Sequence, residues 1–143
     1  MRKKEGNKKT VLFVCTHNSA RSQMAEALLN SSYGDRFVAF SAGTKPSRVN
    51  PYAVKAMAEL GIDISKNRSK NINEFQGKEF DYVVTLCDSA KSECPFFPSA
   101  KKLIHAGFEN PSDFAGTDEK VMDGFRKLRD DIEDWIKKFA VEK

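Results

Sequence analysis

The stretch that decides the fold is "VLFVCTHNSARS", residues 11–22. Its first four residues form a continuous apolar run, which is typical of a strand buried on both faces of a parallel sheet. The run ends at Cys15, and Arg21 and Ser22 open the next segment, "RSQMAEALLNSSYG", whose apolar residues recur at helical spacing. The stretch therefore predicts a strand, a short loop and a helix, with a cysteine at the carboxyl end of the strand.

Strand and helix patterns alternate along the rest of the chain. Further strands are predicted at "RFVAFSAG" (36–43) and "FDYVVTLCD" (80–88), with a weaker one at "KKLIHAGF" (101–108). Helices are predicted at 21–34, 50–61 and 118–139, and a short helical turn at 71–76. This alternation favours an α/β fold with a parallel sheet and right-handed crossovers.

The predicted helices carry boundary and packing signals. The segment 50–61 has Asn50 as a cap, Pro51 in the first turn and Gly61 beyond the last turn. Its expected core-facing residues are Val54, Met57 and Ala58, and those of the first helix are Met24, Ala25, Leu28 and Leu29. The last segment predicts a long amphipathic helix with apolar residues three or four positions apart: Val121, Phe125, Leu128, Ile132, Trp135 and Phe139.

Length and charge narrow the classes of function. The chain has 143 residues, enough for one domain with its own core, which we place at residues 10–143. The net charge of +4 comes from residues 1–9, which contain five basic residues and one acidic residue. We expect these nine residues to form a flexible tail. No basic groove or zinc-ligand spacing indicates a nucleic-acid partner. No apolar run approaches the roughly 20 residues of a membrane span, so no membrane association is expected.

The three cysteines, Cys15, Cys87 and Cys94, favour catalysis over a disulfide scaffold. The basic N-terminus is not followed by the apolar region of a secretory signal. We therefore expect a cytoplasmic protein with reduced thiols. An odd number of cysteines in a reducing compartment points to a reactive thiol.

The loop after the first strand has the composition of an oxyanion site. In open α/β sheets, ligands bind at the carboxyl ends of strands, where N–H groups of a loop and a helix N-terminus surround an anion. A nearby cation and a helix N-terminus favour a thiolate, so Cys15 is expected to be the nucleophile. Ser22 is expected to donate to its sulfur, and Asn18 to brace the loop. The predicted oxyanion-binding residues are Thr16, His17, Asn18, Ser19, Ala20, Arg21 and Ser22.

The segment "VCTHNSARSQMAEA" closely resembles the active-site loop of the low-molecular-weight protein tyrosine phosphatase superfamily, and within it the thioredoxin-coupled arsenate reductases. The blocks "FSAGT", "NPYAVKAMAELGIDIS" and "VVTLCDSAKSECPFFP" match that family in order and spacing. The resemblance runs from about residue 10 to residue 139. It implies a single-domain, three-layer sandwich in which helices flank a four-stranded parallel sheet.

The resemblance also implies a relay of three thiols. Cys15 attacks arsenate held by the loop and Arg21, and Cys87 then attacks Cys15, releasing arsenite. Cys94 next attacks Cys87, which moves the disulfide to the Cys87–Cys94 pair. Thioredoxin or a similar dithiol protein resets the enzyme. No cofactor or metal is expected, and we expect a monomer.

The sequence differs from the family pattern at the acid that protonates the leaving oxygen. In the family this acid is an aspartate immediately before a proline. Here Asn110 precedes Pro111, and an amide cannot donate the proton in that role. Asp113 is therefore the predicted acid, with Glu109 as the alternative.

A second departure concerns a potassium-binding network that some family members have. Ser41 and Glu26 match two of its positions, whereas the third falls near Arg68 and Lys70, where an acid is absent. A fixed side-chain cation can replace the ion electrostatically. We therefore predict no potassium requirement.

Two other functions compete with arsenate reduction. A tyrosine phosphatase acting through a phosphocysteine would use the same anion loop, because phosphate and arsenate are close in shape. Cys87 and Cys94, and the absence of a tyrosine after Pro111, favour the reductase. A non-catalytic oxyanion-binding or phosphocysteine-carrier domain would have no use for the two further cysteines.

Overall fold

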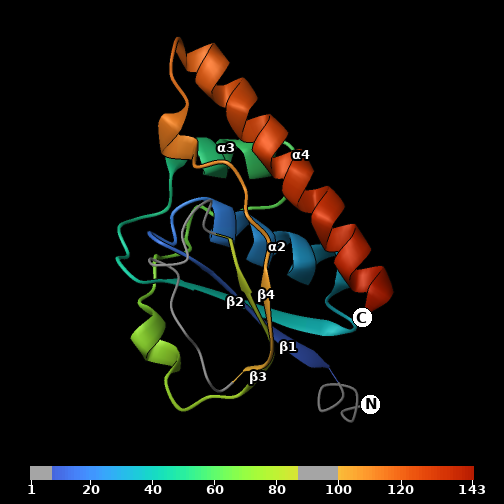
Figure 1. The fold of residues 1–143 in the computed structure, drawn as a ribbon. Helices are drawn as coiled ribbons and strands as arrows, with labels where there is room; N and C mark the ends of the chain where they lie inside the picture. Colours follow the sequence, from blue (N-terminus) through green and yellow to red (C-terminus); the bar gives the residue numbers. More distant parts are fainter. Residues whose placement is uncertain (1–7, 87–99) are drawn as a thin grey trace.

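The computed structural model describes residues 8–86 and 100–143 as one α/β domain, whose chain course is shown in Figure 1. Strands and helices alternate as the sequence predicts. In chain order the elements are β1 (Lys9–Cys15), α2 (Arg21–Tyr33), β2 (Phe37–Gly43), α3 (Pro51–Ala58), the 3₁₀ helix η1 (Ile72–Phe75), β3 (Phe80–Thr85), β4 (Ala100–His105), the 3₁₀ helix η2 (Pro111–Asp113) and α4 (Asp118–Glu142).

The four strands form one parallel sheet in the order β2-β1-β3-β4, which confirms the prediction of a four-stranded parallel sheet. Cys15 of β1 lies opposite Gly43 of β2, and Val14 lies opposite Thr85 of β3. The strands therefore end at one common edge. The strand order reverses direction between β1 and β3, and ligands of such sheets bind at this switch point.

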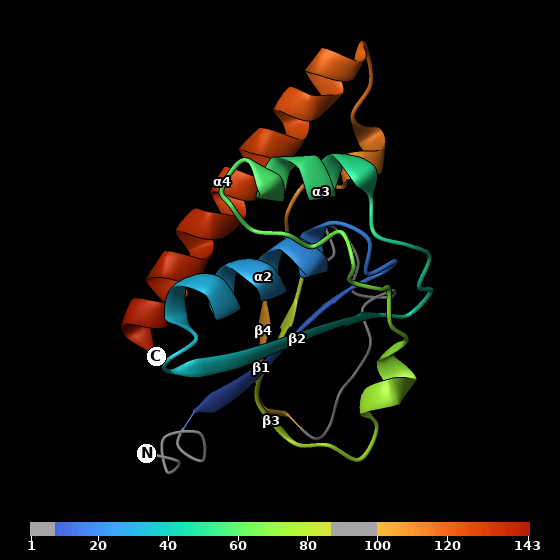
Figure 2. The ribbon, with the colours of Figure 1, turned by 180° about the vertical axis from the view of Figure 1, so that it is seen from behind.

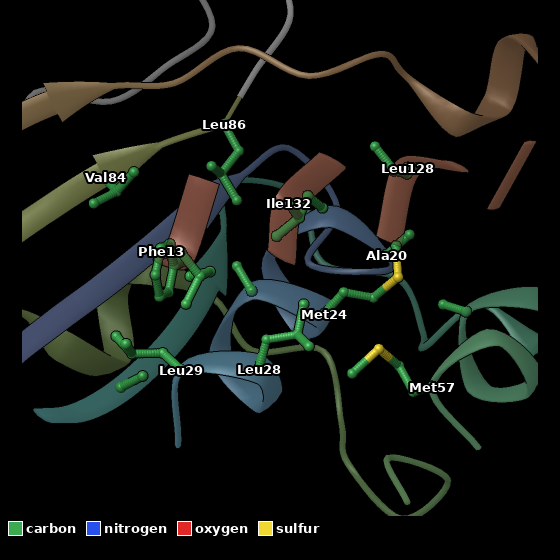
Figure 3. Packing of buried hydrophobic residues seen from close by; sticks show 14 of the residues in the cluster. Phe13, Ala20, Met24, Leu28, Leu29, Met57, Val84, Leu86, Leu128 and Ile132 are labelled. Atoms are coloured by element: carbon green, nitrogen blue, oxygen red, sulfur yellow. The ribbon is translucent and has the colours of Figure 1, made fainter. Parts of the chain in front are cut away.

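Helices cover one face of the sheet and the 3₁₀ helix η1 lies on the other. Figures 1 and 2 show α2 crossing the sheet beside α4, with α3 packed against α4 on the same side. Figure 3 shows the core between these helices and the sheet, where Met24, Met57 and Ile132 come from three different helices. Each large apolar side chain buried there contributes about 1.5–3 kcal/mol to folding.

The opposite face of the sheet has its own small core. It is built around three aromatic rings, Phe40, Phe75 and Phe80, whose centroids lie 5.7–5.9 Å apart in edge-to-face contacts. The apolar run of β1 therefore splits, with Phe13 facing the helices and Leu12 facing the aromatic rings. This two-sided burial is the reason for a continuous apolar run instead of an alternating one.

The helix signals in the sequence are confirmed, with one exception. The Asn50 side chain accepts from the backbone N–H of Tyr52 at 2.8 Å and caps α3, and Gly61 follows with φ of 79°. Ala58, however, is exposed, so its predicted place in the core was wrong. The buried residues of α3 are Ala53, Ala56 and Met57, and the next position turns about 100° farther around the helix, toward solvent.

The first strand begins at Lys9, inside the predicted tail of residues 1–9. The Lys9 N–H donates to the carbonyl of Arg36 at 3.0 Å, and Lys9 Nζ donates to the carbonyl of Lys143. Residues 1–7 lie outside the described residues, so a flexible tail there stays a prediction. Among the helices that the structure describes, none combines the length and apolar character needed to cross a membrane.

Candidate active site

Cys15 lies at the carboxyl end of β1, is 2% exposed, and lines a pocket of about 120 Å³. The pocket opens at the sheet edge, where the loop after β1 meets the first turn of α2. Residues from three separate segments surround it: Cys15, His17, Ser19, Ala20, Arg21, Asn50, Asn110 and Pro111. The structure thus brings together Cys15 and Arg21, as the sequence predicts, in a site sized for a small oxyanion.

Gly43 lets the loop lie close against the end of β2. A Cβ atom at this position would lie 2.6 Å from the carbonyl oxygen of Thr16 and 2.8 Å from the backbone nitrogen of Asn18. Those distances are shorter than real Cβ contacts, so any side chain would displace the loop. The glycine that closes the second strand is therefore a requirement of the anion loop.

The segment after β2 turns the loop's carbonyl groups away from the pocket. The carbonyls of Thr16 and Ser19 accept hydrogen bonds from the backbone N–H groups of Lys45 and Asn50, at 2.8 and 3.0 Å. Because the C=O and N–H of one peptide point in opposite directions, the N–H groups of the next residues, His17 and Ala20, face the other way. Both of these residues line the pocket, where N–H groups can bind an anion.

Ser22 and Asn18 form a short chain of hydrogen bonds to Cys15. The Ser22 hydroxyl lies 3.0 Å from Cys15 Sγ, and Asn18 Nδ2 donates to Ser22 Oγ at 2.7 Å. Ser22 and Asn18 are both fully buried. Asn18 has φ of 51°, a left-handed conformation that asparagine tolerates better than most residues. Ser22 thus contacts Cys15, and Asn18 contacts Ser22, from inside the protein, and the donation from Ser22 to the sulfur stays a prediction.

Arg21 is held at the pocket by carbonyl groups from two other segments. Its Nη1 donates to the carbonyl of Leu86, after β3, at 3.4 Å, and to that of Phe108, after β4, at 3.3 Å. The side chain is only 5% exposed. Arg21 therefore lies at the pocket wall, and a guanidinium group has the planar fork geometry that suits a bidentate contact to an oxyanion.

The predicted acid does not line the pocket. Asn110 and Pro111 form the pocket wall, whereas Asp113 is exposed at the end of η2 and its backbone N–H donates to the carbonyl of Asn110 at 3.0 Å. Glu109, the alternative, is exposed as well. The role of either carboxyl group in proton transfer stays a prediction.

Lys70 takes the place predicted for a fixed cation. Its Nζ lies 3.9 Å from Glu26 Oε1 and 3.5 Å from Ser41 Oγ, and Ser41 Oγ donates to Glu26. Burial raises the pKa of Glu26 and lowers the pKa of Lys70, and the attraction between the two charges opposes both shifts.

Arg68, the other candidate for the fixed cation, instead pairs with Glu74 at the surface. The Lys70 backbone N–H also donates to Asn18 Oδ1 at 2.8 Å, which links this cluster to the anion loop.

Two polar residues of the site escaped the sequence analysis. Gln23 is fully buried and its amide donates to Asn18, and Asn50 lines the pocket in addition to capping α3. Gln23 stands among the apolar positions of the first helix, beside Met24, and only that placement could have singled it out. Asn50 was recognised as a cap, and a cap at the end of a loop that follows the second strand lies near the sheet edge.

The other two cysteines, Cys87 and Cys94, lie outside the described residues. Leu86, the last described residue before them, donates its N–H to the carbonyl of Val14 at 2.8 Å. The chain therefore leaves the sheet beside the end of β1. In residues 8–86 and 100–143, no group of three or more His, Cys, Asp or Glu side chains could hold a metal ion.

Comparison with known proteins gives one consistent family. Residues 10–143 match the family model described as "Low molecular weight phosphotyrosine protein phosphatase". The arsenate reductase of Halalkalibacterium halodurans is 48% identical over 134 residues, which cover 94% of this chain and 96% of that protein.

Two solved structures share the fold. The arsenate reductase of Archaeoglobus fulgidus superposes with a TM-score of 0.71 at 36% identity, covering 90% of this chain and 97% of that one. The thioredoxin-dependent arsenate reductase of Corynebacterium glutamicum superposes with a TM-score of 0.68 at 26% identity, covering 99% of this chain and 67% of that one. The chain therefore belongs to the low molecular weight phosphotyrosine protein phosphatase family.

Proposed function

We propose that the protein is an arsenate reductase that converts arsenate to arsenite and so serves arsenic detoxification in the cytoplasm. One observation carries this proposal: a buried cysteine, supported by Ser22, shares a small pocket with Arg21 in a chain 48% identical to an arsenate reductase. Arsenate is a tetrahedral oxyanion, which suits a pocket lined by an arginine and by loop N–H groups.

The first step forms a covalent bond between Cys15 and arsenic. The thiolate attacks arsenate bound by Arg21 and the loop, one oxygen leaves as water after protonation, and arsenic stays in its +5 state. Asp113 is the proposed donor of that proton. Ser22 donates a hydrogen bond to the sulfur before the attack, which favours the charged form of the thiol.

The second step reduces arsenic. The Cys87 thiolate attacks Cys15 Sγ, and the electron pair of the sulfur–arsenic bond goes to arsenic, which leaves as arsenite in the +3 state. Two thiols have lost two electrons and share a Cys15–Cys87 disulfide. Cys94 then attacks Cys87, which frees the Cys15 thiolate and leaves a Cys87–Cys94 disulfide.

Thioredoxin or a similar dithiol protein closes the cycle by reducing the Cys87–Cys94 disulfide. The name of the Corynebacterium glutamicum relative supports this choice of donor. The test is arsenate-dependent consumption of reducing equivalents with thioredoxin and its reductase. The proposal expects sustained turnover in the wild type and none in Cys15→Ser. Absence of arsenate turnover with every dithiol donor tried would overturn it.

Phosphatase activity is the second candidate, and the family match supports it. Cys15 and Arg21 are sufficient for a phosphocysteine intermediate, because phosphate resembles arsenate. Asn110 lines the pocket at the position before Pro111 where the family has an aspartate, and a side-chain amide cannot protonate the leaving oxygen of a phosphate ester. We therefore expect aryl phosphate hydrolysis to be a slow side activity that depends on Cys15.

A further inference from the structure

Gln23 is a fully buried amide in the first turn of α2 with no part in the steps above. Its Nε2 lies 3.2 Å from Asn18 O, 3.0 Å from Asn18 Oδ1 and 3.0 Å from Arg68 O. Its Oε1 accepts from Asn67 Nδ2 at 3.1 Å. Every polar atom of this amide has a partner, so it joins the anion loop to the segment before η1 in one defined arrangement.

The neighbours of Gln23 fix the direction of each hydrogen bond. Arg68 O and Asn18 O are backbone carbonyls, which can only accept, so the NH₂ group of Gln23 must face them. Asn18 Oδ1 faces the backbone N–H of Lys70, which can only donate. The Asn18 amide is therefore oriented as well, with its NH₂ group toward Ser22.

This orientation sets the role of the Ser22 hydroxyl. Because Ser22 Oγ accepts from Asn18 Nδ2 at 2.7 Å, its own hydrogen is available for Cys15 Sγ at 3.0 Å. A hydrogen bond donated to a thiolate stabilises the charged form. With the Asn18 amide reversed, Ser22 would face an oxygen atom and donate to it instead of to Cys15.

We propose that Gln23 is a positioning residue for the nucleophile: it holds Asn18 in its left-handed conformation with the amide turned toward Ser22, so that Ser22 donates to Cys15. Gln23 acts through Asn18 and Ser22 and does not touch the pocket. The proposal rests on the proposed role of Cys15 as the nucleophile.

The hydrogen bonds of the Gln23 amide given above, all within the described residues, involve no charged side chain near Cys15, although Lys70 Nζ and Gln23 both donate to the Arg68 carbonyl. Of the described residues that line the pocket, His17 and Arg21 carry titratable or charged groups. Behind Asn18 lie Lys70 and Glu26, from the segment before η1 and from α2. The Asn18–Ser22 chain is the hydrogen-bonded path from Gln23 to Cys15, so we expect a shift caused by loss of the Gln23 amide to be transmitted along it.

The test is the pH profile of Cys15 alkylation by iodoacetamide in a Cys87→Ser, Cys94→Ser background, where Cys15 is the one remaining thiol. We expect Gln23→Met to lower the alkylation rate at neutral pH about three- to tenfold, the usual range for one lost hydrogen bond. The midpoint of the profile moves to higher pH. Gln76→Met makes the same chemical change at an exposed site after η1 and leaves the profile unchanged.

A Gln23→Met protein that unfolds at the wild-type temperature and keeps the wild-type alkylation profile would overturn the proposal.

A second measurement needs no substitution at Gln23. In the wild-type chain, the side-chain NH₂ resonances of Gln23 should titrate with the midpoint of Cys15 alkylation, and they should stay constant in Cys15→Ser. Resonances that are constant in both proteins would contradict the coupling.

Alkylation and NMR require no arsenate, so they separate this inference from the proposed function. A wild-type protein without arsenate turnover but with the expected Gln23→Met shift would overturn the reductase and support the positioning role. Normal arsenate turnover in both wild type and Gln23→Met, with an unchanged KM and kcat, would support the reductase and overturn the positioning role.

Discussion

Lys70 Nζ lies 3.9 Å from Glu26 Oε1, and this half-buried ion pair lies behind the anion loop, to which the Lys70 backbone is bonded through Asn18. The ammonium group also contacts Ser41 Oγ and the carbonyl of Arg68, at 3.5 and 3.2 Å. A carboxylate, a hydroxyl and a carbonyl are oxygen ligands of the kind that a bound cation would use. Lys70 supplies that positive charge from the chain itself.

The first prediction is that turnover does not depend on potassium. Replacing potassium with sodium at constant ionic strength should leave kcat and KM unchanged in the wild type, because Lys70 neutralises Glu26. Lys70→Asp removes this charge and adds a second carboxylate beside Glu26, so activity should fall and then recover as potassium is added. A wild-type enzyme that is activated by potassium, or a Lys70→Asp variant that is indifferent to it, would contradict this account.

The second prediction concerns acid stability through Glu59, which ties α3 to α4. Its carboxylate pairs with Arg126 at 2.9 Å and with Arg129 at 2.8 Å, and hydrogen bonds from Arg126 and then Arg129 lower its pKa to about 2. The folded-state pKa lies below the ordinary 4.5, so the stabilisation is present above pH 4.5 and is lost as the pH falls toward 2.

Urea unfolding of wild type and Glu59→Gln measures this effect. The wild type should have the higher midpoint at neutral pH, and the two midpoints should converge as the pH is lowered from 4.5 to the lowest pH at which both proteins fold. Glu133→Gln serves as a matched control on α4, because the part of the chain that the structure describes shows no ion pair between Glu133 and another helix. A constant gap between wild type and Glu59→Gln across this range would show that charge is not the cause.

The third prediction concerns Gly43, whose missing side chain makes room for the loop. Gly43→Ala places a methyl group 2.6 Å from the Thr16 carbonyl, so the loop must move. Displacement of binding groups by about 1 Å costs on the order of 100-fold in activity. Isothermal calorimetry with phosphate should show the loss in anion affinity directly, and thermal unfolding should separate it from a loss of stability. Wild-type affinity in Gly43→Ala would contradict the proposed contact.

The fourth prediction tests the acid. Asp113→Asn should lower kcat for arsenate about 100-fold, the lower end of the usual contribution of general acid catalysis, with KM little changed. Glu109→Gln is the matched variant on the other side of Pro111, and the account expects it to retain activity. The opposite ranking would transfer the role to Glu109.

Much of the fold could be predicted because its signals are local. The apolar run of β1 is buried on both faces, and the periodicity of α4 places Phe125, Leu128 and Ile132 in the core. β4 gave the weaker signal because it is an edge strand with Lys101, Lys102 and Leu103 exposed. The sequence alone could not give the strand order, which depends on pairings between distant segments.

The site could be predicted where residues adjacent in sequence act together, as Cys15, Asn18 and Ser22 do. The site could not be predicted where the position of a side chain depends on segments that are distant in the sequence. The sequence could not choose between Arg68 and Lys70 as the fixed cation, since the choice depends on which side chain turns inward. Nor could it show that Gln23 points into the anion loop, because a buried amide and a surface amide look alike in a sequence.

The most direct test of the thiol relay is to trap its first disulfide. Cys94→Ser is reacted with one equivalent of arsenate without thioredoxin, alkylated under acidic conditions, digested and analysed by mass spectrometry. The account predicts one equivalent of arsenite and a peptide pair joined by a Cys15–Cys87 disulfide. Three conditions would contradict it: no arsenite, a disulfide that lacks Cys15, or continued multiple turnover by Cys94→Ser when thioredoxin and its reductase are added.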